Sequence, residues 1–215
     1  CILLSFLVKA QYYNFNFKSY KVKDGLTSDD IQCLYTDSDG FLWIGTKFGL
    51  SEFDGQNFRN FYFDPKNKSS LGGAHVLDIK EDNEGNLWVA IENFGLTKVN
   101  RKNHQFENFE IPFNKIVEER YINTVHIAKD GKIWVGTETA INLFDPVSKK
   151  YIKAGVKDRN EKIDIISILS DDQGNLWAAT YEGEILYKRK VDNQFSTLNK
   201  IPKIGIITKE FLSLW

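Results

Sequence analysis

Short apolar runs separated by turn residues recur along the whole chain. In the first part of the sequence these runs cover roughly residues 30–36, 41–46, 49–54 and 57–63. They are rich in branched, aromatic and threonine residues and are too short for helices, so the pattern predicts β-strands. Between the first two runs lies Asp37-Ser38-Asp39-Gly40, where aspartate can bond its own backbone and glycine accepts a positive φ. We therefore expect four antiparallel strands joined by hairpins.

The same pattern returns in four successive units. Each unit carries a tryptophan three residues after a glycine, and branched aliphatic residues stand nine and twelve positions before that tryptophan. The tryptophans are spaced by 45, 46 and 43 residues and are Trp43, Trp88, Trp134 and Trp177. Self-similarity at a period of about 40–50 residues indicates repeated supersecondary units, each too small to bury its own apolar face.

The strand that holds the tryptophan has large apolar side chains on both faces, as in Leu42-Trp43-Ile44. Such a strand belongs to a sheet that is covered on both sides. Four-stranded antiparallel sheets packed face to face around an axis meet this requirement, and the glycine or alanine two residues after each tryptophan would let neighbouring sheets approach. We predict an all-β fold, a β-propeller of about four four-stranded antiparallel blades in a partial ring of a larger propeller. A linear β-solenoid is the alternative, but its repeats are usually shorter and its coils parallel.

The predicted blades cover residues 31–63, 76–111, 122–155 and 165–196. Phe211 and Leu214 keep the spacing of the inner strand and are expected to start a fifth unit at 211. Because that unit stops before its tryptophan and the chain starts without methionine, we expect a fragment of a longer protein.

The N-terminal residues predict a secreted chain. Residues 1–10 resemble the tail of a secretory signal peptide, since Val8 and Ala10 are compact residues at the two positions that a signal peptidase reads. A buried first strand is the alternative interpretation. Residues 11–30 are rich in aromatic residues and predict an N-terminal closing strand with a lead-in to the first blade.

Charge and cysteine content narrow the function classes. The net charge is -1 and the charged residues are evenly spread, which argues against a nucleic-acid or acidic-lipid surface. The two cysteines give no disulfide framework, and Cys33 is expected to behave as a small hydrophobic residue. The run Lys188-Arg189-Lys190 predicts a solvated strand edge that resists edge-to-edge association.

Candidate chemistry is sparse, and we expect no catalytic residue, no metal site and no cofactor. His75, His104 and His126 occupy different positions in their units and lack cysteine or carboxylate neighbours at metal-ligand spacing. No phosphate-binding glycine loop or nucleophile elbow is found in the sequence.

Aspartates recur at one turn position and could suggest acid–base or calcium chemistry. They are Asp37, Asp82 and Asp171, and the third unit has Ala128 at the same position. Their recurrence in the same turn predicts a structural, turn-capping role instead. The segment Ser170–Trp177 fits the Asp-box of sialidases, but the five arginines stand at unrelated unit positions.

Taken together, the motifs resemble the regulator-propeller repeats of bacterial hybrid two-component sensor histidine kinases. Residues 17–34, which contain Asp24-Gly25-Leu26, resemble the first repeat of that family, and residues 37–55 are close to its consensus. The resemblance covers about residues 12–215. The third unit departs from it at Ala128 and Ala140, and the fourth at Lys188.

The resemblance implies a periplasmic sensor segment of an inner-membrane histidine kinase that recognises a glycan breakdown product. It also implies contacts with the rest of the same sensor chain and a homodimer, with no nucleic acid bound by this segment. None of the kinase machinery lies in this stretch, so we expect this segment not to be an enzyme. A sialidase-like glycoside hydrolase propeller and a protein-interaction propeller are the alternatives.

An oligosaccharide is expected on the face that carries the hairpins between the second and third strands. The long connections 64–75, 112–121 and 155–164 lie on the same face, and long loops on a rigid scaffold concentrate binding residues. Aromatic rings there could stack on sugars while polar groups bond hydroxyls. The candidate residues are Lys47, Phe48, Glu92, Asn93, Phe94 and Tyr181. The alternative for each is an exposed hairpin tip without a ligand.

Overall fold

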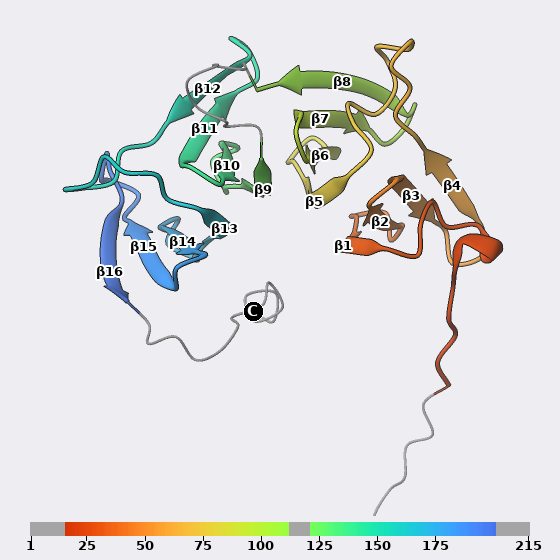
Figure 1. Ribbon diagram of the computed structural model, residues 1–215, viewed down its shortest axis with the longest axis horizontal. Coiled ribbons are helices and arrows are strands. Elements are labelled where there is room, and N and C mark those ends of the chain that lie inside the picture. The colour runs from red at the N-terminus through yellow and green to blue at the C-terminus, as the bar shows by residue number, and fades with distance from the viewer. Residues whose placement is uncertain (1–15, 112–120, 201–215) are drawn as a thin grey trace, which may run out of the picture.

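The computed structural model describes residues 16–111 and 121–200 of the 215-residue chain. Within these residues the chain forms four antiparallel sheets of four strands each, and the sheets follow one another as blades around an arc (Figure 1). The predicted all-β propeller architecture is confirmed.

Each blade runs outward in sequence order from its first strand to its fourth. Blade 1 contains β1 (Ile31–Thr36), β2 (Leu42–Thr46), β3 (Gly49–Phe53) and β4 (Phe58–Phe61). Blade 2 contains β5 (Val76–Glu81), β6 (Asn86–Ile91), β7 (Gly95–Asn100) and β8 (Gln105–Glu110). Blade 3 contains β9 (Ile122–Ile127), β10 (Ile133–Thr137), β11 (Ile141–Asp145) and β12 (Lys150–Lys153). Blade 4 contains β13 (Ile165–Ser170), β14 (Leu176–Thr180), β15 (Glu184–Lys188) and β16 (Ser196–Lys200).

The inner strands β1, β5, β9 and β13 lie along the concave side of the arc, and each contacts the next (Figure 1). Side-chain hydrogen bonds link β9 to both of its neighbours, β5 and β13. The Thr124 hydroxyl donates to Asp78 Oδ2 at 2.8 Å, and Asn123 Nδ2 donates to Asp164 Oδ1 at 2.8 Å and to the Ile165 carbonyl at 3.0 Å. The blades are therefore held together by polar contacts as well as by apolar packing.

The core consists of three apolar layers, one between each pair of adjacent blades. Trp43 packs in the layer between blades 1 and 2, Trp88 in that between blades 2 and 3, and Trp134 in that between blades 3 and 4. The tryptophan strands β2, β6 and β10 are accordingly almost fully buried, as their two-sided apolar pattern predicts. In β14 buried positions alternate with half-buried ones, because the described residues place a blade against only one of its sides.

Two glycines allow the close approach of neighbouring blades. A Cβ atom on Gly45 would lie 2.6 Å from Val76 Cγ1, and one on Gly136 would lie 2.7 Å from Ile165 Cγ2. Both distances are too short for a real side chain, which explains a glycine two residues after the tryptophan in blades 1 and 3.

The turn aspartates cap their turns, as predicted. Asp37 Oδ1 accepts the backbone N–H groups of Asp39 at 3.0 Å and Phe41 at 2.9 Å. Its second oxygen, Oδ2, accepts the indole N–H of Trp43 at 2.8 Å. The same indole bond recurs from Trp88 to Asp82 at 2.8 Å and from Trp177 to Asp171 at 3.2 Å. The aspartate thus joins the turn to the tryptophan, a second role that the sequence reasoning missed.

The predicted closing strand is wrong for residues 16–30, which contain one turn of 3-10 helix, η1 (Val22–Asp24), and no strand. Tyr20 instead packs edge-on against Phe53 and Phe58, with ring centroids 5.0 and 5.5 Å apart. These ring contacts hold the segment against blade 1. The predicted signal-peptide tail, the first residues of the closing strand and the fifth unit at 211 lie outside the described residues.

Cys33 is half-buried in β1, in line with its predicted apolar role, and packs at the edge of the layer between blades 1 and 2. Among the described residues, no helix is long and apolar enough to cross a membrane.

Candidate functional site

The propeller segment has two faces that differ in their loops. We call hairpin face the side that carries the hairpin residues 47–48, 92–94, 138–140 and 181–183 and the connections 62–75 and 154–164. We call turn face the opposite side, which carries the turns 37–41, 82–85, 128–132 and 171–175 and the loops between third and fourth strands. All six candidate residues from the sequence lie on the hairpin face.

The candidates of blades 1 and 4 are exposed. Phe48 has 58% of its surface exposed and Tyr181 has 73%. The Lys47 N–H bonds the Asp30 carbonyl at 3.1 Å, and the Tyr181 N–H bonds the Asp164 carbonyl at 2.9 Å. Both hairpins are thus anchored by their backbones and present an aromatic ring to solvent.

The candidates of blade 2 form a local cluster with a histidine. Glu92 Oε2 lies 2.9 Å from His75 Nδ1 and accepts Asn93 Nδ2 at 3.4 Å. The other ring nitrogen, His75 Nε2, is buried and has no hydrogen-bond partner among the described residues. Phe94 is half-buried over Gly72, where its Cε1 atom would lie only 2.3 Å from an added Cβ, so it supports the 62–75 connection.

The candidate hairpins stay separate from one another. Within the described part of the chain, no hydrogen bond or ion pair links Lys47, Phe48 or Tyr181 to the Glu92 hairpin. No pattern in the sequence assigned a role to His75. It joins this cluster only through its contact with Glu92.

A pocket of about 340 Å³ opens on the hairpin face at blade 3, which the sequence reasoning did not include among its candidates. Its walls come from the β10–β11 hairpin and from the connection that follows β12, with Thr139, Lys153, Arg159 and Asn160 among the lining residues. The sequence signal that pointed here was the long connection 155–164, which we expected on this face but to which we assigned no residue.

An ion pair closes one side of this pocket. Arg159 Nη1 bonds Glu184 Oε2, Arg159 Nη2 donates to Glu184 Oε1 at 3.2 Å, and Arg159 Nε lies 3.3 Å from Glu161 Oε1. The hydrogen bonds that Arg159 donates to Glu184 raise the pKa of the Arg159 guanidinium above its ordinary value, and burial opposes this shift. Arg159 is therefore a fixed cation that belongs to the connection and is held by blade 4.

A carboxyl group near the Tyr181 hairpin also has a shifted pKa. Burial raises the pKa of Asp164, the hydrogen bond from Asn123 opposes the shift, and the charge of Glu182 adds to it. The hairpin face therefore offers aromatic rings, hydroxyl and amide groups and single charges, which suit the binding of a polar molecule. No group of three or more His, Cys, Asp or Glu side chains in residues 16–111 and 121–200 could hold a metal ion.

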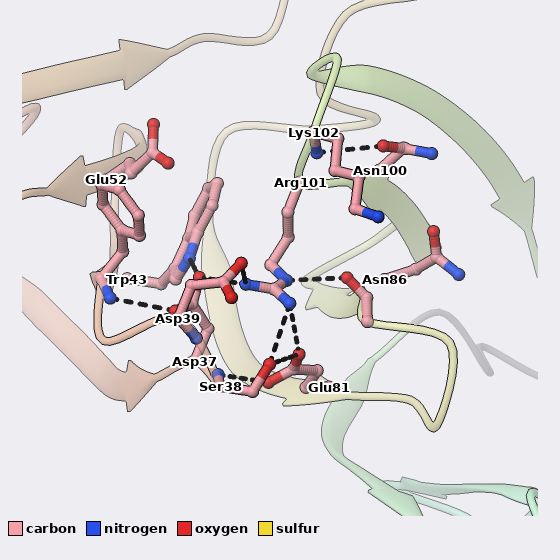
Figure 2. A network of polar contacts seen from close by, with 12 residues as sticks. Asp37, Ser38, Asp39, Trp43, Glu52, Glu81, Asn86, Asn100, Arg101 and Lys102 are labelled. Atoms are coloured by element: carbon pink, nitrogen blue, oxygen red, sulfur yellow. Dashed lines mark hydrogen bonds and ion pairs between the residues drawn. The ribbon is translucent and has the colours of Figure 1, made fainter.

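The densest polar network lies on the turn face, between blades 1 and 2 (Figure 2). Arg101, in the β7–β8 loop, extends to the turn of blade 1 and contacts Asp37 Oδ2 at 3.0 Å, Asp39 Oδ2 at 2.7 Å and Ser38 Oγ at 2.9 Å. Its Nη2 also lies 2.7 Å from Glu81 Oε1. We call this network the arginine clasp.

The clasp is buried and tightly bonded. The side chains of Arg101, Asp37 and Glu81 are only 9%, 1% and 9% exposed. Burial alone would raise the pKa of Asp37, but the hydrogen bonds from Trp43, Phe41 and Arg101 outweigh it and hold that pKa below its ordinary value. Every charged group at the centre of the clasp has a partner, so it joins two blades and leaves no group for a ligand.

Known proteins share both the sequence pattern and the fold. The family model of the two component regulator propeller matches residues 25–48 and 70–93. Histidine kinase P4 of Formosa agariphila is 41% identical over 73 residues, which are 33% of this chain and 5% of that protein.

Solved structures agree in fold at low identity. Virginiamycin B lyase of Staphylococcus aureus superimposes with a TM-score of 0.62 at 14% identity, over 80% of this chain and 56% of the lyase. The extracellular domain assigned to a hybrid two-component system of B. thetaiotaomicron gives a TM-score of 0.53 at 18% identity, over 80% of this chain and 28% of that one.

The matched segments are consistent with the structure. Residues 25–48 run from the lead-in through β1 and β2, and residues 70–93 cover the equivalent part of blade 2. Blades 3 and 4 have the same strand order and tryptophan position. Blades 1 and 2 therefore match the two-component regulator propeller repeat, and blades 3 and 4 share their architecture.

Proposed function

We propose that this chain is the extracytoplasmic sensor segment of a hybrid two-component histidine kinase. The observation that carries the proposal is the 41% identity with a histidine kinase over 73 residues. Two regulator propeller repeats and the fold shared with the extracellular domain from B. thetaiotaomicron support it. Because the chain spans only 5% of the length of the kinase, the signalling activity itself is part of the proposal.

The segment acts in this proposal by binding and not by catalysis. A sialidase-type site, the main enzymatic alternative, needs a cluster of arginines. Four of the five arginines are instead each bound to carboxylates in different parts of the fold: Arg59 to Glu52, Arg101 to Asp37, Arg159 to Glu184 and Arg189 to Asp192. Arg120 lies outside the described residues. Arginines held apart in this way count against the hydrolase.

The ligand in this proposal is a glycan breakdown product bound on the hairpin face in the periplasm. Exposed aromatic rings at Phe48 and Tyr181 could stack on sugar rings, and the His75–Glu92 pair could bond hydroxyl groups. The pocket of about 340 Å³ beneath the 154–164 connection is large enough for one small polar ligand. A homodimer is part of the same proposal.

The proposal can be tested with neutral oligosaccharides. We expect at least one neutral di- to hexasaccharide to raise the melting temperature of the 215-residue chain in a thermal-shift screen. Isothermal titration calorimetry should then give a dissociation constant that is weakened at least about tenfold by Tyr181→Ala or Phe48→Ala, as expected for the loss of a stacking ring.

Val147→Ala is the matched control, because Val147 is an exposed apolar residue on the turn face. If no glycan changes the melting temperature while a protein partner does, the sugar-sensing assignment is wrong and the protein-interaction propeller replaces it. Cleavage of a glycan during the titration would support the hydrolase instead.

A further inference from the structure

Blade 3 departs from the other blades at one buried polar contact. In blades 1, 2 and 4 an aspartate carboxylate accepts the tryptophan indole N–H. Blade 3 has Ala128 in this position, although its turn has the same backbone bonds, from the Ala128 N–H to the Lys132 carbonyl at 2.9 Å and from the Gly131 N–H to the Ala128 carbonyl at 2.8 Å. The indole N–H of Trp134 therefore has no acceptor of its own blade, and none is found elsewhere in the described residues.

Asp130 takes over only part of the missing role. Its Oδ1 accepts the Lys132 N–H at 3.2 Å, and its Oδ2 lies 2.6 Å from Lys132 Nζ. The turn is thus still capped by a carboxylate, but this carboxylate points toward lysine and leaves the indole without a bond.

A pocket of about 160 Å³ lies at this position, between blades 3 and 4 on the turn face. Ala128, Trp134 and four lysines are among its lining residues. Lys129 is paired with Asp172 and Lys132 with Asp130. Lys188 and Lys190 have no ion pair within the described part of the chain, and Lys188 Nζ lies 5.9 Å from the centre of the Trp134 ring. The pocket is therefore lined by the Trp134 ring, by two lysines without an ion pair in the described residues, and by Asp130, whose carboxylate is already paired with Lys132.

The run 188–190 was expected to be a solvated edge. Arg189 and Lys190 are exposed, as this prediction requires, and Arg189 is paired with Asp192. Lys188 departs from it, because it is half-buried. Lys188 and Lys190 both line the pocket, together with Gly174 and Leu176.

Comparison with the equivalent junction between blades 1 and 2 indicates which chemical group fits this pocket. Lys190 occupies in blade 4 the place of Arg101 in blade 2, since each stands thirteen residues after the tryptophan of its blade. Each also lies beside the turn glycine of its blade, Gly174 or Gly85. In the arginine clasp this cation meets the Asp37 carboxylate that binds the indole (Figure 2). Between blades 3 and 4 the cation and the indole are both present, and Ala128 replaces the carboxylate.

We infer that the pocket between blades 3 and 4 binds the carboxylate of a small molecule. The carboxylate accepts the Trp134 indole N–H, as Asp37 does from Trp43, and is neutralised by Lys188 and Lys190. Charge-assisted bonds of this kind are among the strongest that a polar site offers. The pocket volume exceeds that of a carboxylate alone, so the rest of a small acid, such as a single uronic acid unit, also has room.

This site is independent of the proposed glycan site, because it lies on the opposite face and involves none of the residues named there. A negative result with carboxylates would not contradict glycan binding on the hairpin face. A negative screen with neutral glycans would not contradict carboxylate binding in this pocket.

The indole N–H of Trp134 is the direct reporter. We would record 15N–1H spectra of the uniformly labelled 215-residue chain and assign the Trp134 indole signal by its absence from Trp134→Phe. Sodium acetate and sodium glucuronate would be titrated at constant ionic strength against sodium chloride. We expect a saturable shift of the Trp134 indole signal. The indole signals of Trp43 and Trp88 should not move, because their N–H groups are already bonded to Asp37 and Asp82.

Two variants make the test specific. Ala128→Asp places an internal carboxylate on the indole and should abolish the titration, and it should fold because it restores the motif of the other three blades. Lys188→Ala combined with Lys190→Ala should weaken binding at least about tenfold, which corresponds to one lost charge-assisted hydrogen bond. Lys66→Ala combined with Lys68→Ala removes the same charge from an exposed connection and should leave binding unchanged.

The inference is overturned if neither acid moves the Trp134 signal, or if the Ala128→Asp chain still binds. It is also overturned if inorganic phosphate binds as tightly as acetate, because the site would then select charge and not a carboxylate.

Discussion

The junction between blades 1 and 2 and the junction between blades 3 and 4 use the same positions in different ways. Both have a turn, a tryptophan and a cation from the loop of the following blade. At the first junction Asp37 and Glu81 neutralise Arg101 in a buried network. At the second, Ala128 leaves Trp134, Lys188 and Lys190 around a pocket of about 160 Å³.

A few residues of the repeat separate a closed junction from an open one: Asp37, Glu81 and Arg101 at the first are replaced by Ala128, Ser170 and Lys190 at the second. The backbone of the turn is the same in both, because its glycine and its backbone bonds do not depend on the aspartate side chain. A repeat protein can therefore exchange an internal contact for a binding site without changing its fold.

The largest change in the free energy of unfolding is expected when the closed junction between blades 1 and 2 is disrupted. Arg101→Ala should lower the free energy of unfolding by about 3–5 kcal/mol, because it leaves buried Asp37 and Glu81 without a partner. Urea denaturation followed by tryptophan fluorescence would measure it. Arg189→Ala removes an exposed arginine from the open side and should have little effect. A loss of similar size in both variants would contradict the contrast between the junctions.

Acid should weaken the open junction selectively through His126. Burial, followed by the charge of Lys80, lowers the pKa of His126 to about 4, and its Nε2 lies 3.0 Å from Ser170 Oγ of blade 4. Between pH 6.5 and about 4 the unfolded chain binds a proton that the folded chain does not, so stability falls as pH falls across this window.

The difference in pKa corresponds to about 3 kcal/mol over the full window. Denaturation at a series of pH values would show the slope, and His126→Gln should remove most of it while keeping a polar contact with Ser170. An unchanged slope in His126→Gln would assign the acid sensitivity to other groups. The turn carboxylates with lowered pKa, such as Asp37, should act mainly at lower pH, since their stabilising contribution is lost only as pH falls through their folded pKa.

The indole N–H groups of Trp43 and Trp134 should contribute differently to the free energy of unfolding. Trp43→Phe removes a hydrogen bond to a buried carboxylate, whereas Trp134→Phe removes none, so the first should cost about 2 kcal/mol more than the second. Both changes remove the same ring atoms, so the loss in packing largely cancels. Equal losses in urea denaturation would show that the bond to Asp37 contributes nothing net.

The smallest effect is expected from closing the open junction. Ala128→Asp should raise the free energy of unfolding by about 1 kcal/mol, through a new bond to the Trp134 indole and the attraction of two lysines. The reverse change Asp82→Ala in blade 2 should lower it. A destabilised Ala128→Asp chain would show that the pocket cannot accept a carboxylate.

Much of the fold could be predicted because its signals are local. The strand order, the hairpins and the capping aspartates follow from alternation, glycine spacing and turn chemistry within about 25 residues of each other. The close blade contacts at Gly45 and Gly136 were also expected from their positions. The indole bond could have been found, because aspartate precedes tryptophan by six residues in three of the four units.

Less of the candidate site could be predicted from the sequence. The exposed hairpin tips at Phe48 and Tyr181 were found by their loop position, and whether they bind a ligand stays a prediction. The His75–Glu92 pair and the Arg159–Glu184 pair were missed, since each joins residues from different loops or strands at 17 or 25 positions apart. No short motif records such a meeting.

Local sequence therefore specified the blade, its turns and the position of each tryptophan, because these depend on side-chain alternation and backbone preferences over a few residues. The packing of one blade on the next set which charges meet. Arg101 finds Asp39 from 62 residues away, and Lys188 reaches the ring of Trp134 in the preceding blade. Such contacts arise only when the curvature of the arc brings a loop of one sheet over the turn of another, and this geometry is a property of the assembled blades.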